Sequence, residues 1–420
     1  MRKILNFFLF LGVLCSSTGA DDIFLFNGYF KSFSTAFLMP SYKIGNEQLT
    51  FPDIGALTNR LRIKFSIKPT VWLSLNTAYD FSPRIQDPVL FQEDVFFADI
   101  ETGKYRFADF RNRLYPEKGD KTGSFGLFHN LDRFYVSVRT KLADIYMGRQ
   151  AIAWGSARII NPTDLIAPFT FNELDPEERK GVDAVRVRIP LGMMDEIDLG
   201  YVAGEDFELD KSAFFIRGKT YVAKTDVSLM CMRFYDHLMI GLDIARSIGG
   251  AGFWVEAAWV NPYVFESENS DEEKNYTRLS VGLDYNLNTK TYGYIEYHFN
   301  SAGKNNTYNY PNVLNSTAFR HGYVYLLGRH YAGLGLTYQM TPLLPFSGLL
   351  LFNMSDGSLT LAPKVEYNIE SDIYISAGAY IGIGRKSEYV LGPLERSNIL
   401  FHSEFGAYPD MIFTSFKIYF

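Results

Sequence analysis

Long apolar runs are missing from most of this chain. Beyond the first twenty residues, no stretch reaches the roughly eighteen apolar residues that a membrane-spanning helix needs. The chain is nevertheless 47% hydrophobic, with a mean hydropathy of −0.07. A helical membrane protein is therefore excluded, and the apolar residues must follow another pattern.

Cysteine is almost absent, with only Cys15 and Cys231 in the whole chain. Cys15 lies in the apolar N-terminal segment. Val13 and Leu14 precede it where a lipid-attachment site needs a small residue, so a lipoprotein is disfavoured. Cys231 alone cannot form a disulfide framework. We expect it to be a small apolar residue.

An excess of one charge sign is also missing. The 41 basic and 47 acidic residues leave a net charge of −6, which argues against a nucleic-acid-binding protein. The chain has no G-x-S-x-G, C-x-x-C or H-E-x-x-H motif and no phosphate-binding glycine loop. We therefore expect no enzymatic activity, no cofactor and no metal site.

Two polar features have simple explanations. His298 lies two residues after Glu296, but without an evident nucleophile this pair is better explained as pore-lining polar residues than as an acid and a base. The acidic stretch 271–275 is better explained as a solvated loop than as a site for a divalent cation.

The N-terminus has the features of a secretory signal peptide. "MRK" is a positive segment, "ILNFFLFLGVL" is an apolar core, and "STGA" ends in the small residues of a cleavage site after Ala20. We expect residues 1–20 to be removed. The remaining 21–420 are expected to form one transmembrane β-barrel domain without a plug.

Aromatic residues and glycine are abundant. Phe, Tyr and Trp make up 16% of the chain, and there are 34 glycines. Alternating rather than continuous hydrophobicity with many aromatics is typical of a transmembrane β-barrel. Alternation bounded by turn residues predicts about eighteen strands, near 25–38, 57–67, 71–82, 131–142, 143–153, 181–190, 195–204, 212–222, 225–235, 237–247, 252–262, 276–287, 290–300, 330–341, 345–354, 358–368, 372–383 and 409–420.

The connections between these segments alternate in length. Every long connection falls at one end of the predicted barrel: 39–56, 84–130, 154–180, 263–275, 301–329 and 384–408. Short periplasmic turns with long extracellular loops are typical of bacterial outer-membrane barrels. We therefore predict an all-β fold, a single antiparallel barrel of 16–18 strands in the outer membrane. A secreted all-β repeat protein is the alternative, but it does not explain this alternation.

The final segment, "FTSFKIYF" at 413–420, alternates with a period of two. It should pair with the first strand, because an open sheet edge cannot exist in hydrocarbon. Its outward face, from Ile412 to Phe420, should contact lipid. A terminal aromatic strand also resembles the signal by which the barrel insertion machinery recognises its substrates, which makes that machinery an expected partner.

Charged residues alternate with the apolar residues along the predicted strands. Since the apolar residues face lipid, the charged residues should face the lumen. One half of the predicted barrel is basic, with Arg60, Arg62, Lys64, Arg133, Arg139, Lys141, Arg186, Arg188, Arg217 and Lys219. The other half is acidic, with Asp243, Glu256, Asp284 and Glu296. Opposed walls would create a transverse field that orients and screens solutes. The simpler alternative is that these positions are polar because water is there.

The third outer loop, 155–183, mixes charged and apolar residues. We expect Leu165, Ile166 and Phe169 to pack on the inner wall, so that the loop folds into the lumen as a constriction. Its carboxylates would then be offered to the basic strands, and the charged residues of the constriction would be Arg158, Asp164, Glu173, Asp175 and Glu178. A compact cap outside the barrel is the alternative.

Part of this region resembles outer-membrane porins of the alginate-export and phosphate-selective type. The resemblance rests on G-R-Q at 148–150, W-G at 154–155 and N-P-x-D at 161–164. It implies an eighteen-stranded barrel with a charged, often arginine-rich lumen for anionic solutes. The acidic second wall departs from a purely anion-selective pattern.

These features predict a porin through which small polar or charged solutes diffuse passively. One alternative is a polysaccharide-export or other substrate-specific channel. Another is a non-transporting barrel that acts as a scaffold, receptor or sheath for a partner such as a cytochrome. The solute and the oligomeric state stay open, a homotrimer included.

Overall fold

The computed structural model describes residues 23–44, 47–91, 105–110, 112–117, 120, 122–168, 170–262, 274–389 and 399–420. The predicted signal peptide, Phe169 and most of the acidic stretch 271–275 lie outside the described residues.

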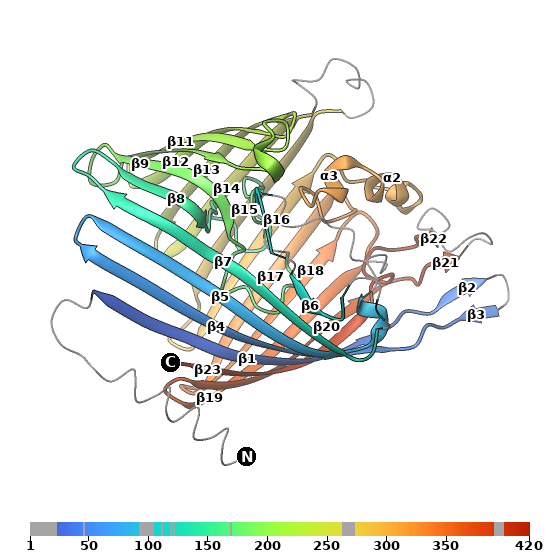
Figure 1. The fold of residues 1–420 in the computed structure, drawn as a ribbon. Coiled ribbons are helices and arrows are strands. Elements are labelled where there is room, and N and C mark those ends of the chain that lie inside the picture. Colours follow the sequence, from blue (N-terminus) through green and yellow to red (C-terminus); the bar gives the residue numbers. More distant parts are fainter. Residues whose placement is uncertain are drawn as a thin grey trace, which may run out of the picture.

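Eighteen antiparallel strands form a closed barrel (Figure 1). Closure is complete because β1 pairs with β4 on one side and with β23 on the other. In order, the barrel strands are β1 (Phe24–Leu38), β4 (Ile54–Thr70), β5 (Leu73–Gln86), β7 (Phe125–Arg139), β8 (Asp144–Gln150), β9 (Val182–Pro190), β10 (Glu196–Val202), β11 (Ala213–Val222), β12 (Thr225–Phe234), β13 (His237–Ile248), β14 (Ala251–Asn261), β15 (Tyr276–Asn286), β16 (Thr291–Asn300), β17 (His330–Thr341), β18 (Leu344–Asn353), β19 (Leu359–Glu370), β20 (Ile373–Ile383) and β23 (Asp410–Tyr419). The predicted fold class and strand order are confirmed.

The two ends of the barrel differ as expected. At the end where β23 finishes, turns of two to five residues join the strands (Figure 1). In the turn between β13 and β14, Gly249 and Gly250 have φ of +58° and +86°, values that a tight hairpin turn requires and that glycine adopts at little cost. The long connections all lie at the opposite end.

Short elements lie within the long connections. They are β2 (Tyr42–Ile44), β3 (Glu47–Leu49), β6 (Arg113–Tyr115), α2 (Tyr310–Leu314), α3 (Thr317–Arg320), β21 (Glu388–Tyr389) and β22 (Ile399–Leu400), with 3-10 turns at Pro88–Phe91, Glu205–Phe207 and Thr307–Asn309. β2, β3, β21 and β22 form a separate small sheet, and β6 pairs with β7. No helix among the described residues is long and apolar enough to cross a membrane.

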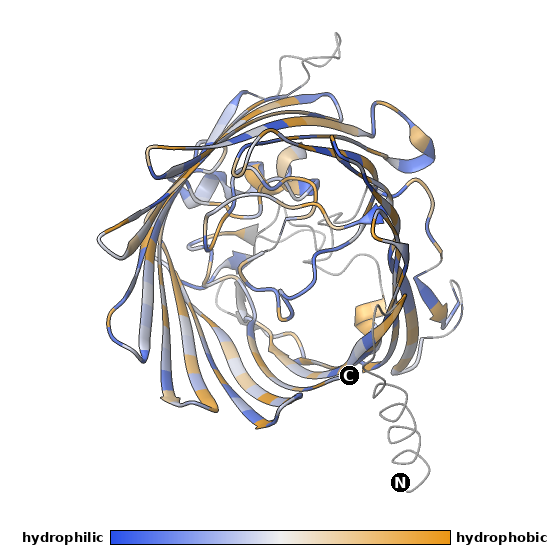
Figure 2. Ribbon diagram, turned by 90° about the vertical axis from the view of Figure 1, so that its left-hand side faces the viewer, coloured by the Kyte–Doolittle hydropathy of each residue, from blue (hydrophilic) through white to orange (hydrophobic). Residues whose placement is uncertain are grey.

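Residues alternate between the two faces of the barrel wall. On β4, Ile63 and Phe65 are each 37% exposed on the outside, whereas Arg62, which directly precedes Ile63, is 1% exposed on the inside. Figure 2 shows the same alternation of hydrophilic and hydrophobic positions along the strands. An apolar outer surface and a polar inner surface are what a barrel in a bilayer requires.

The C-terminal strand closes the sheet. The backbone N–H of Gly28 donates to the carbonyl of Phe420 at 2.8 Å, and the N–H of Phe420 donates back at 3.0 Å. Ile412 is 51% exposed on the outer face, while Phe413 is buried on the inner face. The predicted pairing of the last strand with the first is confirmed.

One irregularity changes which residues face inward. On β7, a bulge inserts one extra residue opposite the β5 pair Ala78 and Tyr79. As a result, the consecutive residues Asp132 and Arg133 both point into the lumen, where Asp132 pairs with Arg62 and Arg133 lies 3.9 Å from Glu178.

Candidate functional site

The third outer loop, between β8 and β9, folds into the barrel, and Figure 2 shows chain segments inside the ring of strands. Ile152, Trp154, Leu165 and Ile166 are buried against inner-face residues of β9 to β15, so the apolar part of the loop packs on the wall. The expected inward fold of the loop agrees with this packing, and an outer cap does not. Phe169, the third predicted packing residue, lies outside the described residues.

The first half of this loop is held by the acidic wall. Glu296 accepts hydrogen bonds from the backbone N–H of Arg158 at 2.7 Å and of Ile160 at 3.0 Å. Glu256 accepts from the N–H and the hydroxyl of Thr163, at 2.8 and 2.7 Å. Both carboxylates are at most 1% exposed. They therefore satisfy backbone donors of the loop instead of facing open water.

Two further acidic residues hold the loop through side chains. Asp243 accepts a hydrogen bond from the hydroxyl of Ser156. Asp284 pairs with Arg158 at 3.0 Å, and the Arg158 guanidinium lies 5.4 Å from the ring centre of Trp254. All four residues of the predicted acidic wall thus contact residues 156–163 of the loop.

The second half of the loop is held by the basic side. Asp175 pairs with Lys31 at 2.8 Å and with Arg60 at 3.1 Å. Glu178 pairs with Lys64, and its carboxylate lies 3.7 Å from Arg62. The loop therefore presents carboxylates to the basic strands, and these ion pairs cover part of the basic surface.

Glu177 makes the most extended contact of this half. Its carboxylate pairs with Lys31 at 2.6 Å and with Lys417 at 2.8 Å, and it accepts from the hydroxyl of Tyr419. Burial raises the pKa of Glu177, but the hydrogen bonds from Lys31 and Lys417 outweigh burial and lower the pKa to about 2. The side chain is therefore charged at neutral pH.

Two other predicted loop residues lie between these halves. Asp164 pairs with Arg179, which also donates to the carbonyl of Ala167. Burial raises the pKa of Asp164 to about 7, although the Arg179 charge acts in the opposite direction. Burial also raises the pKa of Glu173, against the charges of Lys180 and Arg179.

Several residues of the predicted basic wall are paired with carboxylates on the barrel strands. Arg62, which is 1% exposed, pairs with Asp80 at 3.2 Å and with Asp132 at 2.5 Å. The further pairs are Arg133 with Asp132, Arg186 with Asp198, Arg188 with Glu196 and Lys219 with Asp226. Arg217 donates to the hydroxyl of Ser228 instead.

Two predicted basic residues lie at the rim. Arg139 ends β7, is 73% exposed in its side chain, and lies 3.5 Å from Asp144. Lys141 differs from the prediction, because β7 ends before it and the residue lies exposed in the turn between β7 and β8. The alternation of the strand simply does not continue that far.

The carboxylate partners on the strands were missed from the sequence, whereas the loop carboxylates Asp175 and Glu178 were expected to face the basic strands. The strand partners lie up to 70 positions away, in the case of Arg62 and Asp132. One signal was available. The turn between β9 and β10 is short, so Glu196 and Asp198 must lie near Arg188 and Arg186, as the register shows.

The G-R-Q motif fixes a second inward connection. Arg149 forms two hydrogen bonds with Asp183, at 2.8 and 2.9 Å. It also pairs with Asp109 at 2.9 Å and donates to the carbonyl of Ala108 at 2.7 Å. This guanidinium thereby ties residues 105–110 of the second outer loop to β9.

The W-G pair lies where the third loop turns toward the acidic wall. Gly155 has φ of +101°, and a Cβ there would lie 2.7 Å from the carboxylate oxygens of Glu256. The indole of Trp154 donates to Asp198 at 3.2 Å. These motif residues therefore shape the loop. Among the described residues, no group of three or more His, Cys, Asp or Glu is arranged to hold a metal ion.

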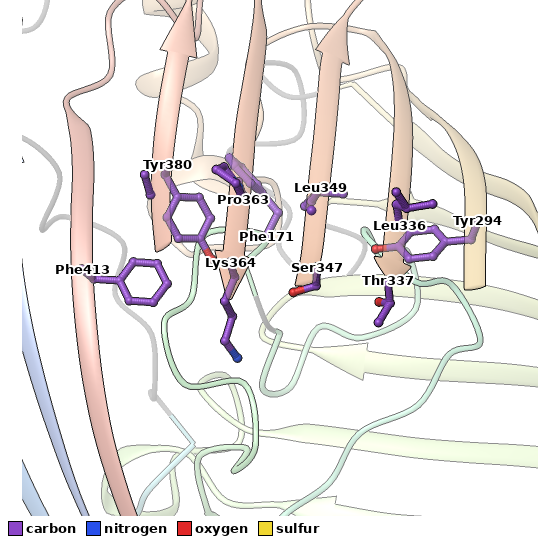
Figure 3. Close-up of a pocket in the computed structure, with 13 residues that line it drawn as sticks. Phe171, Tyr294, Leu336, Thr337, Ser347, Leu349, Pro363, Lys364, Tyr380 and Phe413 are labelled. Carbon is purple, nitrogen blue, oxygen red and sulfur yellow. The ribbon is translucent and has the colours of Figure 1, made fainter. Parts of the chain in front are cut away.

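A cavity of about 190 Å³ lies between the loop and the inner wall of β16 to β23 (Figure 3). We call it the side pocket. Its lining includes Lys364 and the aromatic residues Phe171, Tyr294, Tyr380 and Phe413. None of these residues was singled out from the sequence, because neither a charge pattern nor a motif marks them.

Comparison with known proteins gives matches in structure alone. No family model matches the sequence, and no curated protein matches it either. Among solved structures, the BenF-like porin from Pseudomonas fluorescens Pf-5 has a TM-score of 0.55 at 7% identity, covering 96% of this chain and 99% of that one. OccD3 (OpdP) of Pseudomonas aeruginosa has a TM-score of 0.53 at 9% identity, covering 97% and 93%.

A third match is OpdK of Pseudomonas aeruginosa, solved with vanillate, with a TM-score of 0.51 at 7% identity over 94% of this chain and 98% of that one. None of these matches tests the resemblance to the alginate-export and phosphate-selective type. The closed eighteen-stranded barrel and its structural matches show that the chain has the fold of the porins of the bacterial outer membrane.

Proposed function

We propose that the chain is a channel through which small polar solutes diffuse passively across the outer membrane. The observation that carries this proposal is the combination of a closed barrel, a polar inner face and a loop that leaves a hydroxyl-lined pocket beside the wall. Inward polar residues have a use only where water and solutes enter.

The inward loop favours a substrate-specific channel over a wide, general pore. Residues 105–110 and 151–181 both enter the barrel, and their contacts involve buried apolar and charged side chains. Such contacts hold the loops in place, because breaking a buried ion pair costs about 3–5 kcal/mol. The solute path is therefore narrow, and the chemistry of the remaining surface selects what passes.

The predicted walls take on a different role in this proposal. Basic and acidic residues lie on opposite sides, but loop groups and neighbouring strands pair with most of them. We propose that selectivity arises from the few groups left open to solutes rather than from a field between two bare walls.

Purified protein in planar bilayers tests the channel. We expect ohmic current steps of uniform size, since each inserted barrel provides one path. A barrel that is folded and inserted but never conducts would contradict the proposal and favour a non-transporting scaffold. A blocking effect of an acidic polysaccharide at low concentration would favour polysaccharide export instead.

The expected surroundings of the barrel also remain proposals. Lipid contacts are supported by the exposed apolar side chains of the outer face, such as Phe65, Phe134 and Ile412. Insertion by the barrel machinery through the strand ending in Phe420, and assembly into a homotrimer, are tested by depletion of that machinery and by cross-linking in membranes.

A further inference from the structure

The side pocket lies where several small residues occur in two neighbouring rows of the inner wall. In register across four neighbouring strands are Thr337, Ser347, Lys364 and Gly378. The row beside it contains Gly335, Leu349 and Ala362. Ser347 and Ala362 leave room beside the wall that larger side chains would fill, and both line the pocket.

Aromatic rings flank this hollow and lie flat against the wall. A Cβ at Gly335 would lie 2.0 Å from the ring of Tyr294, and a Cβ at Gly378 would lie 2.6 Å from the ring of Phe413. Both rings therefore rest on glycine positions. Phe171 of the third loop completes the lining (Figure 3).

Four hydroxyl groups belong to the lining: Tyr294, Thr337, Ser347 and Tyr380. None of them hydrogen-bonds to another described residue. A hydroxyl both donates and accepts, so together these groups match a ligand that does the same. Apolar surface with a few converging polar groups is the usual composition of a small-molecule site.

The pocket offers little net charge. Among the described lining residues, Lys364 alone is charged, and its ammonium group is paired with Glu366 at 2.9 Å. An anionic ligand would have to compete with that carboxylate. A neutral ligand can hydrogen-bond to both members of the pair without disturbing it.

We propose that the side pocket binds a neutral, polyhydroxylated solute of monosaccharide size. Such a molecule has an apolar C–H face that packs on the aromatic rings and hydroxyl groups that bond to the four hydroxyls of the lining and to the Lys364–Glu366 pair. The inference rests on the proposed channel function, because it names the class of solute for which the path is suited.

Binding and conduction are tested separately. Calorimetry on the purified, detergent-solubilised protein measures the affinity for D-glucose, with vanillate as an aromatic anion of similar size. Current recordings in planar bilayers measure whether D-glucose reduces the ion current in a saturable way. We expect saturable glucose binding, a matching current reduction and no comparable effect of vanillate.

Two variants locate the site. In Tyr294→Leu/Tyr380→Leu both rings and two hydroxyls are lost, so glucose affinity should fall by at least about tenfold. In Thr337→Val/Ser347→Ala two hydroxyls are lost with almost no change in volume, which should weaken binding by about tenfold at most. The matched control is Tyr338→Leu/Tyr367→Leu, whose side chains are 41% and 47% exposed on the outer face of the same wall.

The outcomes separate the two proposals. Absence of glucose binding in calorimetry overturns the inference, whether or not the barrel conducts. Binding of vanillate but not glucose, lost in Lys364→Met, overturns it in favour of an anion site. An equal loss of affinity in the outer-face control would also overturn it. Glucose binding by a barrel that never conducts would uphold the site and contradict the channel.

Discussion

Individual side chains in this barrel act mainly by holding inward segments in place. Arg149 shows this most clearly, because one guanidinium serves Asp183, Asp109 and two backbone carbonyls. The planar fork of arginine matches a carboxylate in two places at once, which lysine cannot do. Such residues determine where the loops lie before any solute enters.

Replacing Arg149 should therefore be costly. For Arg149→Ala we expect a loss of about 3–5 kcal/mol in the free energy of unfolding, because Asp183 would remain buried without its partner. Urea unfolding in detergent micelles measures this loss. Arg139→Ala is the control, since this exposed side chain should change stability by less than about 0.5 kcal/mol. Equal effects of the two substitutions would contradict the assigned role of Arg149.

The pKa of Glu177 predicts a dependence of stability on pH. Its pKa is lowered from 4.5 to about 2, so the contribution of this carboxylate is complete above pH 4.5 and is lost as the pH falls toward 2. We expect the thermal midpoint to decrease over this range, and Glu177→Gln to decrease less steeply. Thermal scans of both proteins at several pH values check this. Parallel curves would show that Glu177 is not linked to folding.

At the scale of elements, the third loop lies between two kinds of anchor. Residues 156–163 are held by carboxylates of the wall, and residues 175–178 offer carboxylates to basic strands. Along most of its length, the loop's backbone donors and charged side chains therefore have partners on the wall. It covers Lys31, Arg60 and Lys64, which would otherwise attract anions.

Removing the loop carboxylates should uncover that basic surface. For Asp175→Asn/Glu177→Gln/Glu178→Gln we expect a shift of the reversal potential toward anions. The shift should be larger in dilute than in molar salt, because the Debye length falls from about 30 Å at 0.01 M to about 3 Å at 1 M.

Bilayer recordings in a salt gradient measure this shift. Glu173→Gln is the matched control, since Glu173 belongs to the same loop but forms no ion pair with β1, β4 or β23 among the described residues. A triple variant with unchanged selectivity at low salt would mean that the basic residues lie away from the solute path.

Most of the elements could be predicted from the sequence because a barrel in lipid imposes a strict alternation of side chains. All eighteen predicted strands are present, and the largest error is the start of β7, which begins at Phe125 rather than 131. Periodicity alone does not reveal the bulge at Asp132, where two consecutive residues share one face.

The candidate site could be predicted only in part. Charge alternation identified Arg62 and Glu256 as inward residues, but their partners Asp132 and Thr163 depend on contacts between distant segments. The side pocket depends on small residues such as Gly335 that align only once the register is known. Local pattern determines the face of a residue, whereas only the assembled barrel determines its neighbours.

At the scale of the whole molecule, inner charges are balanced locally rather than separated into two bare walls. Arg186 with Asp198 and Arg188 with Glu196 are examples within one hairpin. The electric field across the lumen is therefore weaker than two walls of unpaired charge would create. The two opposite charges of each pair lie a few ångströms apart, so their fields largely cancel. The selectivity of the intact barrel between cations and anions should accordingly be weak.

We expect a reversal potential near zero for the unmodified barrel in a gradient of dilute potassium chloride. In Arg186→Gln/Arg188→Gln the partner carboxylates Asp198 and Glu196 would be left unbalanced, so the potential should shift toward cations. Arg139→Gln at the rim is the control, and it should have little effect. Strong anion selectivity of the unmodified barrel would contradict local balance.

The third loop also has a mechanical consequence for the barrel. It bonds to β14 through Glu256 and to β4 through Arg60, and these two strands lie nine places apart in either direction around the ring. The loop thus links opposite sides of the barrel. A barrel without such a link deforms easily to an oval cross-section, whereas this barrel must break ion pairs between the loop and the wall to deform in that way. The shape of the cross-section and the position of the loop therefore change together.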